Sequence, residues 1–77
     1  MSREWQNKLP LAPFGAILKD ITKMKISTSA NVALREVIAE VIEELAHDAT
    51  EFANNANRVT IKDRDIHSAF RNWRKRR

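Results

Sequence analysis

The segment "ANRVTIKDRDI", residues 56–66, gathers side chains that could bind a polyanion. Arg58 and Thr60 lie close together, and guanidinium and hydroxyl groups are donors suited to phosphate oxygens. Asp65 follows where a helix is expected to begin, and a carboxylate is favoured near the positive end of a helix. The segment therefore predicts a phosphate-binding loop with an acid placed to orient its arginine.

The spacing of Arg58 and Asp65 has a second interpretation. An ion pair between them would either direct the arginine at a ligand or only tie the loop to the next helix, since single ion pairs are commonplace. Side chains of an extended loop alternate between faces, so Arg58 and Thr60 are expected to face outward while Val59 and Ile61 face the core. The residues alone leave both roles of the ion pair open.

Other kinds of chemistry find little support in the sequence. There are no cysteines, hence no disulfide framework and no thiolate metal site. His47 and His67 have no second ligand at a useful spacing, so we interpret both as ordinary surface residues. Neither a nucleophile–base pair nor a glycine loop for phosphates is present. The sequence therefore predicts a protein that is not an enzyme and binds neither a metal nor a cofactor.

The 77 residues are enough for one small domain, whose core alone would be marginal. Charge is unevenly distributed: residues 36–57 contain six acids and no lysine or arginine, whereas the rest holds all 14 basic residues against four acids. The basic regions, including the C-terminal "FRNWRKRR", favour a nucleic-acid partner, although basic residues also suit a helix C-terminus. The acidic stretch is either a solvated face or a docking patch for a basic tail or partner.

No targeting or membrane segment is apparent. Residues 1–10 lack the apolar run of a signal peptide, and no stretch approaches the roughly 20 apolar residues of a membrane span. We therefore expect a soluble, cytoplasmic protein.

The spacing of apolar residues predicts three helices. Both prolines and the only glycine fall within the first 15 residues, which argues for helix in the remainder. Residues 1–8 are expected to form a polar tail before a short helix that contains Pro13 in its first turn. Ser27 is a suitable N-cap for a long middle helix, with Thr28 and Ser29 as alternatives, and Asn57 is a suitable left-handed residue at its end. A third helix is expected from about Asp63.

The long middle helix predicts a dimer. About 29 helical residues span roughly 43 Å, whereas a compact domain of this size is only about 30 Å across. Two short helices cannot cover an apolar stripe of that length, so a second copy of the chain is expected to cross it. The residues expected in this dimer core are Leu34, Val37, Ile38, Val41, Ile42, Leu45 and Ala49.

The order short helix, loop, long helix, loop, short helix, with "LPLAPFG" at its start and "RVTIKDRDI" at the second loop, resembles the archaeal core histones. The resemblance covers residues 9 to about 74. It implies an all-α histone fold over residues 9–77 and a handshake dimer, formed with itself or with a paralogous histone. It also implies that dimers assemble further on double-stranded DNA and wrap or compact the chromosome in the cytoplasm.

The resemblance assigns roles to particular residues. Arg58 and Thr60 of the second loop would contact DNA phosphates, and Asp65 would hold the arginine in place through an ion pair. Lys25 stands where the family usually has an arginine. A lysine keeps the positive charge but lacks the planar guanidinium group and its paired N–H donors. The positions that match DNA-contacting residues are Lys19, Lys25, Arg58, Val59, Thr60 and Lys62. The positions that match the contact between neighbouring dimers are Phe52, Asn55 and Asp65.

Three departures from the family pattern favour other functions. Ala16 and Val59 replace residues that are commonly basic, and Thr22 stands where the family has a loop glycine. These changes favour a protein that bridges or coats DNA without wrapping it. The acidic middle helix favours instead a histone-fold subunit of the transcription-factor type, which would need a different partner chain. A sequence-specific helical repressor has no recognition-helix signal in its support.

Overall fold

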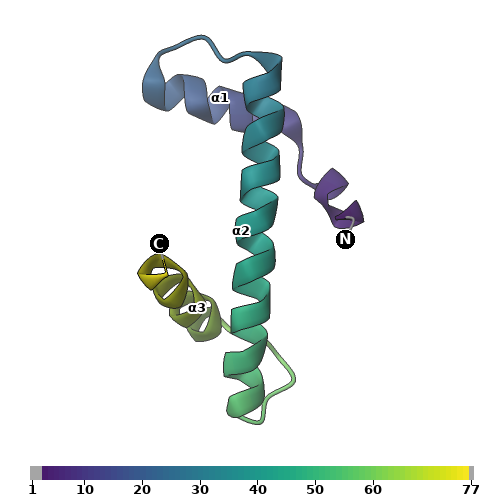
Figure 1. Ribbon diagram of the computed structural model, residues 1–77, viewed down its shortest axis with the longest axis vertical. Coiled ribbons are helices and arrows are strands. Elements are labelled where there is room, and N and C mark those ends of the chain that lie inside the picture. The colour runs from purple at the N-terminus through teal and green to yellow at the C-terminus, as the bar shows by residue number, and fades with distance from the viewer. Residues whose placement is uncertain (1–2, 77) are drawn as a thin grey trace. The chain divides into compact units, whose positions relative to one another are not determined.

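The computed structural model describes residues 3–76 and contains helices but no strand over that range (Figure 1). This confirms the all-α class and the short–long–short order of helices. The elements are a 3-10 helix η1 (Glu4–Lys8), α1 (Leu11–Thr22), α2 (Thr28–Asn55) and α3 (Asp63–Lys75). The chain divides within α2 into two compact units, Met1–Glu40 and Val41–Arg77.

In the first unit, α1 ends through local hydrogen bonds that set the path of the first loop. The Thr22 hydroxyl donates to the Leu18 carbonyl at 2.7 Å and accepts the Met24 N–H at 3.2 Å. Lys23 then takes up the left-handed conformation (φ 62°), and its N–H bonds the Lys19 carbonyl at 2.7 Å. The residue that reverses the chain is therefore Lys23, one position after Thr22.

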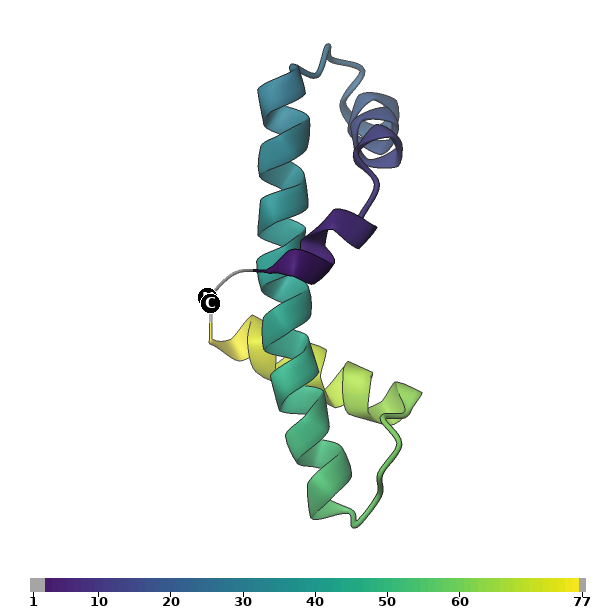
Figure 2. The ribbon, with the colours of Figure 1, turned by 90° about the vertical axis from the view of Figure 1, so that its right-hand side faces the viewer.

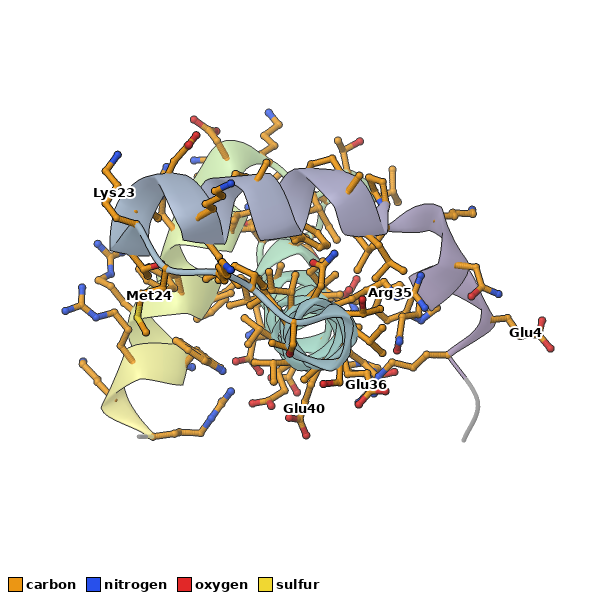
Figure 3. The ribbon with its side chains drawn as sticks, turned by 90° about the horizontal axis from the view of Figure 1, so that it is seen from above. Glu4, Lys23, Met24, Arg35, Glu36 and Glu40 are labelled. Carbon is orange, nitrogen blue, oxygen red and sulfur yellow. The ribbon has the colours of Figure 1, made fainter. Side chains whose placement is uncertain are left out.

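Helix α2 begins as expected, with Ser27 as its N-cap. The Ser27 hydroxyl accepts the Ala30 N–H at 3.1 Å, which satisfies one of the unpaired donors of the first turn. Gly15 of α1 lies against Asn31, and a Cβ at position 15 would stand 3.2 Å from the Asn31 amide nitrogen. The glycine thus permits close approach of α1 to the start of α2, seen along the axis of α2 in Figure 3.

In the second unit, α2 ends in a complete Schellman motif. Asn57 has φ 58°, and its N–H bonds the Asn54 carbonyl at 2.9 Å, while the Arg58 N–H bonds the Ala53 carbonyl at 3.0 Å. The expected role of Asn57 is confirmed. The chain then runs as a loop to α3, which begins at Asp63 as expected and crosses the C-terminal part of α2 (Figure 2).

Among the described residues, the apolar side chains that are buried are all alanines: Ala39, Ala49, Ala53 and Ala69. Alanines let helices approach closely but remove little apolar surface from water. Larger residues stay accessible to solvent: Val37 is 55% exposed, and Leu45 is only half-buried. The other large apolar residues that remain exposed are Ile17, Ile21, Met24, Ile42, Val59, Ile61, Ile66 and Phe70.

No helix within residues 3–76 combines the length and the apolar character that crossing a membrane would require.

Candidate nucleic-acid interface

A bidentate ion pair between Arg58 and Asp65 organises the second loop. The Arg58 nitrogen Nη1 lies 2.6 Å from Asp65 Oδ2, and Nη2 lies 2.8 Å from Oδ1. Nη1 also donates to the Thr60 carbonyl at 3.1 Å, so the arginine spans the loop that it begins. Planar, bidentate pairing fixes the direction of the guanidinium as well as its position. The expected pairing of Arg58 and Asp65 is confirmed.

Asp65 also holds the start of α3. Its Oδ2 accepts the backbone N–H of Lys62 at 2.8 Å, which is the contact that the third helical residue of a capping box makes to the N-cap residue. The reciprocal contact is missing, because a lysine side chain has no acceptor. Only 2% of Asp65 is exposed. The hydrogen bonds from Arg58 and Lys62 hold the pKa of the Asp65 carboxyl far below its usual range, and the bond to Asp65 raises the pKa of Arg58. Both groups are therefore charged at neutral pH.

The expectation that Val59 and Ile61 face the core is wrong for the folded chain. Val59 is fully exposed, and Ile61 is exposed as well. Arg58, expected to face outward, is instead paired with Asp65, and only 18% of its side chain is exposed. The loop bends at Val59 and Thr60, so its side chains do not alternate, and Val59, Thr60 and Ile61 are all exposed. An apolar residue thus stands on the outer surface of the loop.

Arg58 nonetheless keeps donors for a ligand. A guanidinium has five N–H groups, and three of them make the bonds to Asp65 and Thr60. Two N–H groups therefore remain without a hydrogen bond within residues 3–76. The side chains of Thr60 and Lys62 are exposed beside it. The loop can thus present an oriented cation, a hydroxyl and a mobile ammonium to a phosphate, while the same arginine braces the fold.

The first loop brings together the two lysines that the sequence singled out. Lys19 of α1 and Lys25 of the loop are exposed and line one open hollow of about 500 Å³. Ser27 and Thr28, at the N-terminus of α2, line the same hollow. Two cations and the positive end of a helix form an environment that favours anions.

The residues matched to the contact between dimers differ in accessibility. Phe52 is half-buried and Asn55 is exposed, so both have surface available to a neighbour. The carboxylate oxygens of Asp65 are instead occupied by Arg58 and Lys62.

A contact that the sequence left undefined joins the C-terminal end to the acidic side of α2. Arg76 Nη1 donates to Asp48 Oδ2 at 2.9 Å, and its Nη2 lies 3.6 Å from Glu44 Oε1. The only sign of this contact in the sequence was the opposite charge of the acidic stretch and the basic C-terminus. It suggested a docking patch for a basic tail as one of two interpretations, but it did not identify the residues in contact.

Comparison with known proteins places the chain in a family. The family model of the core histone domain matches residues 1–72. The chain is 34% identical to one chain of the archaeal histone HAN1 of Thermococcus zilligii over 64 residues, which cover 83% of this chain and 96% of that protein. It is 33% identical, with the same coverage, to probable archaeal histone 3 of Methanocaldococcus jannaschii.

A third relative is the DNA-binding protein HmvA of Methanococcus voltae, 40% identical over 58 residues, or 75% of this chain and 59% of that protein. The family match, residues 1–72, contains both loops, α1, α2 and most of α3. The resemblance drawn from the two loop motifs is thereby confirmed, and the chain belongs to the core histone family, with archaeal histones among its relatives.

Proposed function

We propose that this histone-fold chain is a chromatin protein that binds double-stranded DNA through its phosphates. The observation that carries the proposal is the second loop, in which Asp65 orients Arg58, two arginine N–H groups make no hydrogen bond within residues 3–76, and the side chains of Thr60 and Lys62 are exposed. These are phosphate donors, which position a protein on DNA without reading its sequence. The name of the relative HmvA gives independent support. Its place in the cell is then the chromosome, in the cytoplasm.

The protein binds DNA as a dimer of the handshake type. Support comes from the apolar stripe of α2, of which the folded chain leaves Val37 and Ile42 exposed and Leu34, Ile38, Val41 and Leu45 only half-buried. Large accessible apolar stripes are characteristic of surfaces that another chain covers. Ala49, in contrast, is already fully buried within the chain. A second copy, or a paralogous histone of similar shape, would cover the remainder.

Wrapping of DNA around successive dimers is the form of compaction that we propose, with bridging or coating as the alternative. Val59 supports the alternative, because it stands fully exposed on the binding loop and carries no charge. Ala16 is likewise exposed in place of a basic residue. Each neutral position removes one phosphate contact, and the affinity lost with it depends on salt.

Nuclease digestion of a long, random-sequence DNA saturated with the pure protein tests this function. A regular ladder of protected fragments is expected if dimers wrap DNA. Protection without a ladder would assign bridging or coating instead. An absence of protection at low salt would contradict DNA binding and favour a histone-fold subunit that needs a different partner.

Lys25→Gln tests the first loop. We expect DNA affinity to fall by roughly threefold to tenfold at ~0.1 M salt, and the slope of log K against log salt to become shallower by about 0.9 for each lost contact. Lys8→Gln is the matched control, since Lys8 is also an exposed lysine but lies in η1, outside both loops. Filter binding or fluorescence anisotropy at several salt concentrations measures both values. Equal effects of the two variants would contradict a specific role for Lys25.

A further inference from the structure

Resting on the proposed DNA binding, we infer that Glu44 and Asp48 are positioning residues that hold the basic C-terminal end on α2 and thereby limit the protein's affinity for DNA. The contact is an ion pair within the chain that competes with phosphate for the same arginine. Freeing Arg76 should therefore strengthen DNA binding, beyond what the removal of two negative charges does by itself.

The geometry that carries this inference lies at the end of α3. Arg76 closes the helix with its backbone N–H bonded to the Asn72 carbonyl at 3.2 Å. Its guanidinium then reaches across to α2, where one nitrogen bonds Asp48 and another approaches Glu44. The Asp48 side chain is only 17% exposed, so this end of the ion pair is largely shielded from solvent. Two carboxylates one helical turn apart therefore share one guanidinium.

Other arginines near this end are bound differently. Arg71 has a long, 3.4 Å contact to the Ser68 hydroxyl, and Arg74 lies over the ring of Phe70, 5.6 Å from its centre. Neither of these contacts offsets the positive charge. Arg76 is thus distinguished from Arg71 and Arg74 by carboxylates that compensate its charge. Release of this one residue would add a full positive charge to a segment that is already basic.

The energetic balance favours an exchange of this kind. Exposed ion pairs are weak and weaken further as salt rises, and half of the Arg76 side chain is exposed. Duplex DNA presents a dense array of phosphates, and each new contact releases condensed counterions. DNA therefore competes for Arg76 against a partner that holds it only loosely. The acids act through Arg76, because carboxylates do not themselves bind phosphate.

The test compares two double variants with the same change in net charge. Glu44→Gln with Asp48→Asn removes both partners of Arg76. Glu36→Gln with Glu40→Gln removes two exposed acids from the N-terminal half of the same helix, which point away from α1 (Figure 3), and leaves Glu44 and Asp48 in place as partners of Arg76. We expect the first variant to bind duplex DNA roughly threefold to tenfold more tightly than the control at ~0.1 M salt, with a salt slope steeper by about 0.9 for each arginine released.

Arg76→Gln, made in the wild-type chain and in the Glu44→Gln, Asp48→Asn variant, tests whether the two acids act through Arg76. In the wild-type chain this change should lower DNA affinity less than it does in the Glu44→Gln, Asp48→Asn background, because the wild-type chain must break the ion pair of Arg76 to gain the phosphate contact. In the Glu44→Gln, Asp48→Asn background it should abolish the gain. The side-chain Nε–Hε signal of Arg76 in ¹⁵N NMR spectra of the DNA-free protein reports on the contact independently, and should shift in the first double variant but not in the control.

Equal affinities and slopes for the two double variants would overturn the inference, as would an Arg76 signal that does not respond to the loss of both acids. A weaker affinity in the first variant, with circular dichroism showing intact helices, would also overturn it, because the contact would then assist binding. Failure of the wild-type chain to bind DNA would be distinct from these results and would overturn both the inference and the proposed function.

Discussion

Replacement of Asp65 by alanine is expected to lower the melting temperature by on the order of 10 °C, because one carboxylate serves three donors. Asp65 accepts two bonds from Arg58 and one from the Lys62 N–H. Without it, the arginine is left partly buried and unpaired, and the first turn of α3 loses its cap. The loop that we propose for DNA binding should loosen with it. Thermal unfolding followed by circular dichroism measures the change.

Asp63→Ala is the matched control for this prediction. Asp63 is an acid in the same first turn of α3, but it is exposed. The two variants change the net charge equally and affect the helix dipole in a similar way. We expect Asp63→Ala to shift the melting temperature by only a few degrees. Similar shifts for both would show that the network around Asp65 contributes little.

The pH dependence of stability follows from the same carboxylate. Its pKa in the folded chain is far below that of an unfolded aspartate, which is about 3.9. A group with a lowered folded pKa stabilises the fold fully above the unfolded pKa, and this contribution is lost as pH falls through the folded pKa. The difference in stability between wild type and Asp65→Asn should therefore be constant near neutrality and shrink below about pH 4. A difference that grew with acid would contradict the assignment.

The sequence predicted those features that depend on neighbouring residues. Ser27 and Asn57 could be identified because capping preferences are local. Arg58 and Asp65 could be paired because they are only seven positions apart and flank one loop. The direction of Val59 was predicted wrongly, because the loop bends at Val59 and Thr60 and its side chains do not alternate as they would in an extended segment.

Contacts between residues far apart in the chain could not be predicted from the sequence. Arg76 and Asp48 are 28 residues apart, and charge alone did not select them from many possible pairs. Ala39 is completely buried although it was not expected in the dimer core. Helical periodicity identifies an apolar stripe, but it does not say which part of that stripe packs within the chain and which part remains for a partner.

That division of the stripe leads to the second large effect, at Val37. We expect Val37→Lys to weaken the proposed dimer at least 100-fold, because covering an unpaired ammonium with apolar surface costs several kcal/mol. The symmetry of a homodimer places the change at the interface twice. Within one chain Val37 is 55% exposed, so the substitution has little to disturb there. Sedimentation velocity across a range of protein concentrations measures the loss of dimer.

His47→Lys separates an interface effect from an effect of charge on the helix. His47 is exposed and lies among the acidic residues of α2, so a lysine there adds a positive charge without entering the apolar stripe. That variant should remain dimeric. If Val37→Lys also remained dimeric, the handshake arrangement would be wrong, since an exposed valine that tolerates a charge is not covered by a partner. If the wild-type chain unfolds when its dimer dissociates, its melting temperature should rise with protein concentration. Such coupling is expected if the buried alanines alone cannot stabilise a single chain.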